Sequence, residues 1–315
     1  MYKLSIFTAT YNRAYVLPKL YESLCLQSCH DFEWILIDDG SSDETVPMIQ
    51  QWLKKQSPFK INFIQAKHGG KIRALNKAIS IAQSDFFLIV DSDDYLKENA
   101  VEWIYSVIPS VNGDGSFAGF SGIRCRNNGD YIRQPDFNGA SYIDCSNIDR
   151  LKYKLDADMA EVYKTSILKK YPFPECEGEN YIPENVVWDQ IALDGYQLRW
   201  FDKKIYVCEY LDDGITKGWD TLRTKNPLGF AMSANTNLKY AQGIYFKLQL
   251  IGEILYCCYL KGDFSFLKKT VYPKIGYMLL PVGFFYYLFR RIRERKLYIQ
   301  VFQKCILFFS RKKDC

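Results

Sequence analysis

The sequence predicts an α/β fold built on a mixed, mainly parallel sheet with helices on its faces. Short β-rich segments alternate with segments of helical spacing over the first hundred residues. The β-rich segments are apolar along most of their length, as expected of parallel strands that helices cover on both faces. With 315 residues, 48% hydrophobic and 24% charged, the chain is long enough for one large α/β domain with an appendage.

Four strands and three helices are expected in the first hundred residues. The strands are expected at 4–9, 33–38, 61–66 and 86–91, and the helices at 14–28, 43–55 and 71–83. In the first helix, Leu17, Leu20 and Leu24 recur at helical spacing. The second helix follows serine and aspartate residues, which favour a helix N-terminus because their side chains accept hydrogen bonds from free amides.

The pattern loosens after residue 112. The segments "NGDGSFAGFSG" and "RCRNNGDY" indicate turns and a meander. Residues 152–173 are typical of a partly buried strand followed by a short helix. A further helix is expected to begin after Pro183 and to end near Gly195. Residues from about 222 to 270 are predicted to be helical.

The last part of the chain is basic and aromatic. From Lys268 onward there are twelve Lys and Arg residues against two acids, whereas the whole chain has a net charge of only +5. Two apolar segments, 275–289 and 297–309, flank the basic sequence "RRIRERK". Each is shorter than the ~20 residues that cross a bilayer. We therefore expect this tail to lie on an anionic membrane surface; the alternative is helices packed on the body or on a partner subunit.

Composition also limits the compartment and the kind of site. The N-terminus enters a strand-like segment without the zones of a signal peptide, so we expect a cytoplasmic protein that is peripheral on the inner face of the cell membrane. The ten cysteines show no metal spacing and are expected to be reduced thiols. Only two histidines are present, which excludes a histidine-based zinc site. Nucleic-acid binding is not expected, because it more usually places basic charge across the folded body.

Acidic residues follow two of the predicted strands. Asp38 and Asp39 end one strand, and Asp91 and Asp93 directly follow another. Ligands of parallel α/β sheets bind beyond the carboxyl ends of the strands. Two carboxylates one residue apart, as in Asp91-Ser92-Asp93, are able to approach one divalent cation, and hard oxygen ligands suit Mg²⁺ or Mn²⁺. The alternatives are a solvated turn for this motif and helix capping for the acids and serines around residue 40.

These segments together resemble glycosyltransferase family 2, whose members are inverting enzymes with a GT-A fold. The matching segments are "FTATYNRAYVLPKLYESLCLQS" (7–28), "EWILIDDGSSDET" (33–45), "KHGGKIRALNKAISIAQSDFFLIVDSDDYL" (67–96) and "PENVVWDQIALDGYQ" (183–197). Their order and spacing agree with the family over roughly residues 1–200. The segments "DDGIT" and "KNPLGF" resemble, more loosely, transferases of bacterial capsule and surface-polysaccharide pathways.

The resemblance implies a nucleotide-sugar site. Its residues would be Thr10, Tyr11, Arg13, Asp38, Asp39, Lys71, Asp91, Ser92 and Asp93. Asp39 would hydrogen-bond uracil, with Asp38 shaping that pocket. Lys71 would approach the ribose or the diphosphate. Asp91 would meet the ribose and, with Asp93, would hold the Mn²⁺ or Mg²⁺ that bridges the diphosphate.

The resemblance also implies a base for the acceptor hydroxyl. The family carries an acidic pair before an aliphatic helix; here Pro183 replaces the first acid, and Glu184 holds the second position. Glu184 is therefore the first candidate for the base and Asp189 the second, whereas Trp188 is either a sugar-stacking or a core aromatic. For Glu184, the alternative is capping of the helix N-terminus.

A histidine that assists the metal in many relatives is absent from this sequence. Asp212, Asp213 or Asp220 is a candidate replacement, unless the third protein ligand is missing. The remaining acid of the strand end, Asp94, is expected only to cap or to support its neighbours.

The predicted protein is a metal-dependent glycosyltransferase that moves a sugar from a UDP-sugar to a polyprenyl-diphosphate-linked saccharide. Residues 1–220 would form the GT-A domain, with a nucleotide half (1–110) and an acceptor half (111–220). A helical extension (221–271) and the membrane-association tail (272–315) would follow. Two alternatives are a non-catalytic nucleotide-binding subunit and a sugar nucleotidyltransferase, although "TATYNRAYVLPK" lacks the glycine-rich basic loop that the latter needs.

Overall fold

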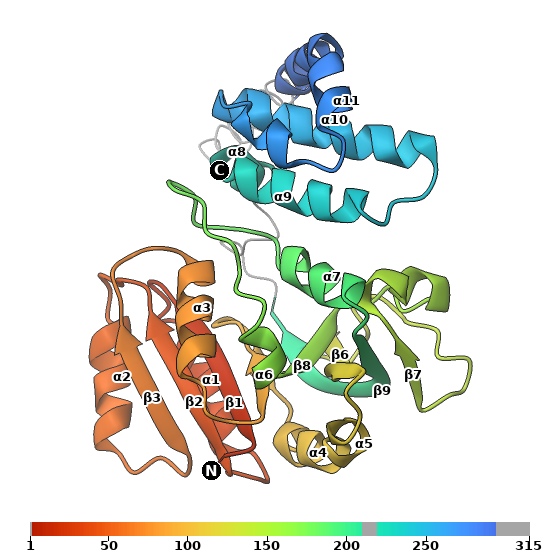
Figure 1. The fold of residues 1–315 in the computed structure, drawn as a ribbon. Helices are drawn as coiled ribbons and strands as arrows, with labels where there is room; N and C mark the ends of the chain where they lie inside the picture. The colour runs from red at the N-terminus through yellow and green to blue at the C-terminus, as the bar shows by residue number, and fades with distance from the viewer. Residues whose placement is uncertain (1, 210–218, 294–315) are drawn as a thin grey trace, which may run out of the picture. The chain divides into compact units, whose positions relative to one another are not determined.

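The chain forms two compact units. The computed structural model describes residues 2–209 and 219–293 (Figure 1). The first unit, Met1–Trp219, contains the β-sheet and is called the sheet unit below. The second, Asp220–Cys315, is helical in its described part and is called the helical unit. Each unit is described by itself.

The first half of the sheet unit is a parallel α/β structure. In chain order its elements are β1 (Leu4–Thr10), α1 (Leu17–Cys25), β2 (Phe32–Asp38), α2 (Thr45–Lys54), β3 (Lys60–Gln65), α3 (Lys71–Ile81) and β4 (Phe86–Ile89). The four strands pair in parallel in the order β3-β2-β1-β4. All seven elements were predicted, with ends that differ by at most a few residues. The structure confirms this part of the predicted fold.

Helices cover both faces of these strands. Leu4, Ile6 and Leu36 share one apolar cluster with residues of α1, α2 and α4 (Ala100–Val107). The strand residues between them point to the other face, because side chains alternate along a strand. Helix α3 crosses that face over β1 and β2 (Figure 1). Burial on both faces explains why the strands are apolar without alternation.

The second half of the sheet unit extends the sheet with antiparallel strands. Its elements, besides α4, are β5 (Tyr95–Leu96), α5 (Pro109–Asn112), β6 (Phe117–Arg126), β7 (Tyr142–Cys145), η1 (Asn147–Tyr153), β8 (Met159–Lys164), α6 (Thr165–Leu168), α7 (Asn185–Leu193) and β9 (Gln197–Cys208). The sheet order is β3-β2-β1-β4-β8-β6-β9-β5, with β7 beside β9. Among the described strands, four of the eight pairings are antiparallel, so the sheet is mixed, as predicted, but not mainly parallel.

The glycine-rich sequence after residue 112 contains predicted turns, at 113, 115–116 and 127–128, but also a ten-residue strand that the sequence analysis did not identify. Residues 117–126 form β6 in the interior of the sheet. A Cβ atom on Gly119 would lie 2.0 Å from the carbonyl oxygen of Val162 on β8. Glycine is therefore needed at this position because the backbone of β8 approaches closely, which is a known reason for glycine within a strand.

The helical unit is built on two packed helices. Its described elements are α8 (Trp219–Lys225), α9 (Pro227–Leu238), α10 (Ile244–Lys261), η3 (Ser265–Lys269), α11 (Pro273–Met278) and helical residues 280–293. The prediction of helix from about 222 to 270 is confirmed. No helix in residues 2–209 or 219–293 is both long and apolar enough to cross a membrane.

The first apolar segment of the predicted tail packs against α10. Arg290 Nη1 lies 2.7 Å from Glu253 Oε2, and the Tyr259 hydroxyl donates to the Leu280 carbonyl at 2.9 Å. The Arg290 guanidinium also lies over the ring of Tyr256, which is fully buried. Residues 275–289 thus form part of the helical unit, as the alternative prediction had it. The second apolar segment, 297–309, lies outside the described residues.

Candidate active site

A cleft of about 650 Å³ lies at the carboxyl ends of β1 and β4. It is lined by eight of the nine predicted nucleotide-site residues, namely Thr10, Tyr11, Arg13, Asp39, Lys71, Asp91, Ser92 and Asp93. Asp38 is the exception. Of the two candidates for the base, Glu184 lines the cleft and Asp189 does not. The structure therefore gathers segments that are up to about 170 residues apart in the sequence around one cavity.

Hydrogen bonds between two loops form the wall on the β1 side. Asn12, with a positive φ of 53°, donates its amide to Ser41 Oγ at 2.8 Å and accepts from the Ser42 amide at 2.8 Å. The Arg13 amide donates to Thr45 Oγ1 at 2.9 Å. These bonds hold the "TYNR" sequence against the "GSSDET" sequence that follows β2. Tyr11 remains half-exposed, with its ring 4.5 Å from that of His68.

Asp38 and Asp39 have different structural roles. Asp39 accepts hydrogen bonds from the Gly69 and Gly70 amides, both at 2.8 Å, and its carboxylate lines the cleft. Asp38 is fully buried and accepts from the amides of Gly40 and Ser41, so it stabilises the turn after β2. This placement supports the shaping role predicted for Asp38 but gives it no surface in the cleft.

A required glycine positions Lys71. Gly70 has a φ of +89°, and a Cβ atom there would lie 2.3 Å from the Asn180 carbonyl oxygen. Only glycine meets both conditions without strain. The turn directs α3 so that its first residue, Lys71, faces the cleft.

Lys71 joins the two halves of the cleft. Its Nζ lies 2.6 Å from Asp91 Oδ1 and 2.8 Å from Glu184 Oε1. Burial lowers the pKa of the Lys71 ammonium, but the charges of Asp91 and Glu184 outweigh this and raise it above its ordinary value. Lys71 is therefore a permanent cation that connects Asp91 with Glu184, the first candidate for the base.

Asp91 is fixed by a second cation. Arg124 Nη1 lies 3.4 Å from Asp91 Oδ2, and the Arg124 guanidinium stacks over the ring of Tyr206 at 4.4 Å. Burial alone raises the pKa of Asp91, but Lys71 and Arg124 together lower it to about 2. The carboxylate is thus ionised at any physiological pH. The Asp91 amide also donates to the Tyr206 hydroxyl at 2.9 Å.

Asp94 contacts Tyr206, which also binds the backbone amide of Asp91. Its carboxylate accepts from the Tyr206 hydroxyl at 2.8 Å and from the Glu209 amide at 2.9 Å. Burial, and then the charge of Asp91, raise the pKa of Asp94 to about 6. These contacts agree with the supporting role expected for Asp94.

Asp93 is the carboxylate best placed to bind a cation. Apart from its own backbone amide, no described residue is seen to form a hydrogen bond or an ion pair with its carboxylate oxygens, although its neighbours Asp91 and Asp94 have several such partners. Burial, and then the charge of Asp91, raise the pKa of Asp93. The charges of Arg13 and Lys71 lower this pKa only in part, so the Asp93 carboxylate has room for a further positive charge.

The charge balance of the cleft also fits a divalent cation. Its lining has eight carboxylate side chains against four cationic ones. No group of three or more His, Cys, Asp or Glu side chains in the described residues forms a ready-made metal site. Asp93, with Asp91 beside it, therefore fits a hard cation whose other ligands come from the bound substrate.

Of the three candidates for a third protein ligand, only Asp220 lies in the part of the chain that the structure describes. Asp212 and Asp213 lie outside the described residues. Asp220 is exposed in the helical unit, where its carboxylate pairs with Arg223 at 3.5 Å.

The two candidates for the base have different environments. The Glu184 side chain is 28% exposed and lies at the N-terminus of α7. Asp189 is buried, and it accepts hydrogen bonds from Asn147 Nδ2 at 2.6 Å and from Asn185 Nδ2 at 3.0 Å. Trp188, between them, is mostly buried and stacks on Tyr163 at 4.3 Å. Trp188 is thus mainly a core aromatic, although one part of it lines the cleft.

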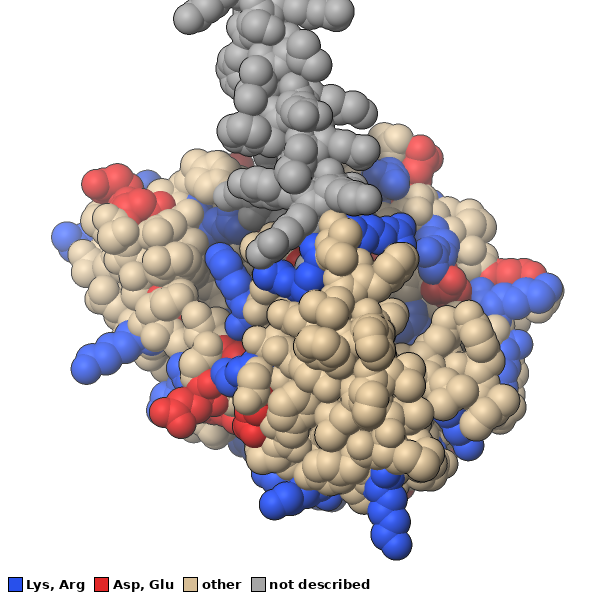
Figure 2. Space-filling model, turned by 90° about the horizontal axis from the view of Figure 1, so that it is seen from above, with Lys and Arg blue, Asp and Glu red and all other residues tan. Residues whose placement is uncertain are grey.

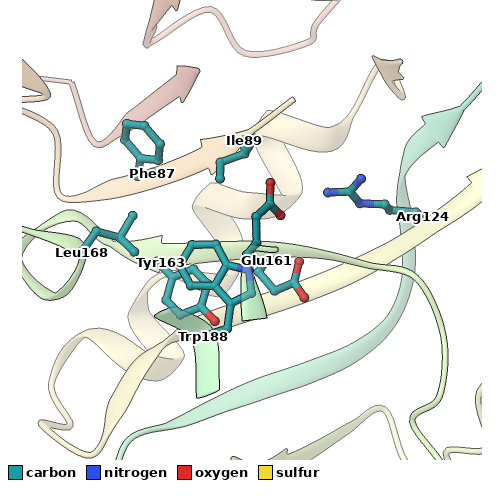
Figure 3. A pocket seen from close by; sticks show the side chains of 8 residues that line it. Phe87, Ile89, Arg124, Glu161, Tyr163, Leu168 and Trp188 are labelled. Atoms are coloured by element: carbon teal, nitrogen blue, oxygen red, sulfur yellow. The ribbon is translucent and has the colours of Figure 1, made fainter. Parts of the chain in front are cut away.

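The sequence analysis did not identify Glu161 or its arginine neighbours. Glu161 lies on β8, and its Oε1 is 4.0 Å from Arg150 Nη1. A small cavity of about 10 Å³, close to the size of one water molecule, is lined by Glu161, Glu184 and Arg124 among others (Figure 3). Burial raises the pKa of Glu161, whereas the arginines lower it less. Only the alternation of β8 could have marked Glu161 as facing the site.

Comparisons with known proteins identify relatives of this site. Residues 5–171 match the model of the family described as Glycosyl transferase family 2. The glycosyltransferase GlyG of Streptococcus pneumoniae serotype 4 is 31% identical over 111 residues, which are 35% of this chain and 36% of the relative. The GalNAc(5)-diNAcBac-PP-undecaprenol beta-1,3-glucosyltransferase of Campylobacter jejuni is 29% identical over 195 residues, covering 60% of this chain and 59% of the relative. The family resemblance predicted from the motifs is confirmed.

A solved structure shows the same fold. Residues 1–349 of Staphylococcus aureus TarS, in complex with UDP-GlcNAc, align with a TM-score of 0.59 and 20% identity, covering 85% of this chain and 76% of that chain. In sequence, the poly(ribitol-phosphate) beta-N-acetylglucosaminyltransferase TarS is 26% identical over 59% of this chain and 30% of the relative. The chain thus matches from about a third to three fifths of the length of these relatives.

The position of Glu161 predicts a pH-dependent effect on stability. A carboxyl whose pKa is higher in the folded than in the unfolded chain lowers the free energy of unfolding as pH rises from the unfolded to the folded pKa. Glu161→Gln removes this loss. In urea denaturation the variant should gain stability relative to wild type as pH rises above about 4.5, the ordinary pKa of a glutamate, by about 1.4 kcal/mol for each unit that separates the two pKa values. Exposed Glu22→Gln is the matched control; a Glu161→Gln difference that stays constant with pH would contradict the prediction.

Proposed function

Because the chain belongs to glycosyl transferase family 2, we propose that it transfers a sugar from a UDP-sugar to a hydroxyl of a saccharide acceptor, with inversion at the anomeric carbon. The proposed acceptor is linked to polyprenyl diphosphate and is elongated at the cytoplasmic face of the membrane for a surface polysaccharide. Two relatives support these details. The Campylobacter jejuni enzyme is named for a PP-undecaprenol acceptor, and the TarS structure contains UDP-GlcNAc.

The observation that carries the proposal is the short distance between the donor-side and acceptor-side acids. Lys71 Nζ contacts both Asp91 and Glu184 within 2.8 Å, in a cleft that the TYNR loop and Asp39 close on the nucleotide side. A sugar whose diphosphate lies near Asp91 and Asp93 would therefore place its anomeric carbon toward Glu184. This arrangement supports a direct transfer in one step.

The chain's own residues have three tasks in that step. Asp39, Tyr11 and Arg13 would hold the uridine part of the donor. Asp93, with Asp91 as the second ligand, would hold Mn²⁺ or Mg²⁺, which neutralises the charge of the departing diphosphate. Glu184 would accept the proton of the acceptor hydroxyl as its oxygen bonds to the anomeric carbon and the bond to the diphosphate oxygen breaks.

Glu184 is a better candidate for the base than Asp189. Its carboxylate lines the cleft and has only Lys71 as an ion-pair partner within the described residues. Asp189 is held by two asparagine side chains and does not line the cleft. A base has to come within hydrogen-bond reach of the hydroxyl that it deprotonates, and position therefore favours Glu184.

The helical unit is proposed to bind the membrane surface. Residues 275–292 expose large apolar side chains, among them Met278 (71% exposed), Phe285 (70%) and Phe289 (64%). Figure 2, a view from above, shows a broad uncharged surface area with Lys and Arg side chains, and some Asp and Glu side chains, around it. Exposed apolar side chains next to basic ones favour an interface with anionic lipids.

The first test of the proposal is a donor screen. Purified full-length protein is incubated with UDP-, GDP- and dTDP-sugars and Mn²⁺, and nucleotide release is measured with and without EDTA. We expect release from one UDP-sugar that EDTA abolishes, and the same loss in Asp93→Asn, which should keep the fold because the Asp93 side chain has no partner among the other described residues. Normal turnover of Asp93→Asn would refute the metal assignment. UDP binding without turnover of any donor, also in the presence of lipid-linked saccharide, would favour the non-catalytic subunit.

The second test compares the two acids of the α7 region. Glu184→Gln should lower the transfer rate by ~10²–10⁴-fold, the usual contribution of a general base, while UDP binding changes little. Asp189→Asn should instead lower the melting temperature, because it disrupts two buried hydrogen bonds, and leave the turnover of the folded fraction within about threefold of wild type. The reverse pattern would transfer the role of base to Asp189.

The third test addresses the membrane surface. Met278→Ser, Phe285→Ser and Phe289→Ser, combined in one variant, should weaken co-sedimentation with phosphatidylglycerol-containing vesicles by at least about tenfold, because each buried apolar side chain contributes roughly 1.5–3 kcal/mol. Leu26→Ser with Leu151→Ser, two similarly exposed residues of the sheet unit, is the matched control. Equal binding by both variants and wild type would refute the docking surface.

A further inference from the structure

The ammonium group of Lys71 occupies the place where two ligands of the proposed reaction have to act. It contacts Asp91 at 2.6 Å, where the metal is proposed to bind, and Glu184 at 2.8 Å, where the acceptor hydroxyl is proposed to bind. Arg124 contacts the other oxygen of Asp91. Both carboxylates are therefore paired with cations of the chain itself.

This pairing has a clear energetic reason. The side chains of Asp91 and Glu184 are each only 28% exposed, and Asp93 and Asp94 lie beside them. Carboxylates that share a water-poor cleft destabilise one another, and removing a partner from a buried charge is costly. Lys71 provides the positive charge that keeps the empty cleft stable.

A bound donor changes this balance. The diphosphate of a nucleotide-sugar offers Lys71 several charged acceptor oxygens, and ammonium groups bind phosphate well. The four-carbon stem of lysine and its compact charge allow such a change of partner more easily than the planar guanidinium of arginine does. Movement of Nζ toward the diphosphate would expose Asp91 and Glu184 together.

We propose that Lys71 is an internal counter-ion that blocks Asp91 and Glu184 in the donor-free protein, and that the donor diphosphate withdraws it. The inference rests on the proposed function and adds a coupling between its parts. Metal and nucleotide favour the same state, with Lys71 released from Asp91, and they therefore bind cooperatively. Glu184 becomes free to accept a proton only after the donor is bound, which sets the order of binding as donor first and acceptor second.

The test measures Mn²⁺ binding rather than activity. Free Mn²⁺ is titrated by electron paramagnetic resonance against the full-length protein, with and without saturating UDP. In wild type, UDP should tighten Mn²⁺ binding by at least about tenfold, within the usual range of coupling between sites. In Lys71→Met, Mn²⁺ binding without UDP should tighten by about tenfold, because the competing cation is gone. The effect of UDP should be smaller than in wild type by about the same factor, and what remains is the contribution of the diphosphate oxygens as metal ligands.

Two further variants control for charge and for folding. Lys54→Met makes the same change of charge at an exposed position, the last residue of α2, and it should behave as wild type. Lys71→Gln keeps a hydrogen-bonding side chain without charge; it should behave as Lys71→Met, and it takes that variant's place if Lys71→Met does not fold. An effect of UDP as large in the Lys71 variants as in wild type overturns the inference. If wild type binds neither Mn²⁺ nor UDP, the proposed function itself is overturned.

Discussion

The accumulation of carboxylates at the end of β4 is the constraint on which the rest of the cleft depends. Asp91, Asp93 and Asp94 follow a strand that is buried along its whole length, so their charges meet where little water is available to screen them. The three carboxylates differ in their partners. Asp91 is paired with two cations, Asp94 accepts two hydrogen bonds and has a raised pKa, and Asp93 has no partner among the other described residues. Because Asp91 and Asp94 are stabilised in these ways, Asp93 is the single carboxylate left for an external cation.

The partners of these acids explain the topology around them. Lys71 comes from the start of α3, Arg124 from β6, and Tyr206 from β9. Strands β6 and β9 lie next to each other, and β8 connects them to β4. The antiparallel half of the sheet thus brings the cation and the hydroxyl that stabilise the acids of the parallel half. The site is a product of the whole sheet and not of one loop.

Much of the fold could be predicted, because the first half of the chain has local signals. Strands β1, β2 and β4 are mostly apolar, and leucines such as Leu17 and Leu20 mark helix α1. Strand β6 was missed because glycine in it allows close backbone contact with β8, which a sequence cannot distinguish from a turn. The number of antiparallel pairings was underestimated for a different reason: β9 pairs in this way with β5 and β7, and β8 with β4 and β6, which are all distant in the sequence.

The residues of the candidate site could likewise be predicted only in part. Residues in short motifs, such as Asp39, Lys71 and Asp93, were found because the family resemblance depends on them. Arg124 and Glu161 belong to no such motif, and only the strand pairing brings them to the cleft. The distinction between Asp38 and Asp39 also needed the structure, because one carboxylate turns toward the backbone of its own loop and the other toward the cleft.

The two cations that contact Asp91 are suited to different tasks. Arg124 is fixed: its Nε donates to the Met159 carbonyl at 2.7 Å, and its guanidinium lies over the Tyr206 ring. Lys71 has a flexible stem, and in the described residues its ammonium contacts only side-chain carboxylates. A fixed cation stabilises Asp91 in every state of the cleft, whereas a movable one compensates charge only while the cleft is empty. A cleft that binds a charged donor and a metal needs both kinds of cation. With only one of them, its own carboxylates would lack a positively charged partner either before or after the donor binds.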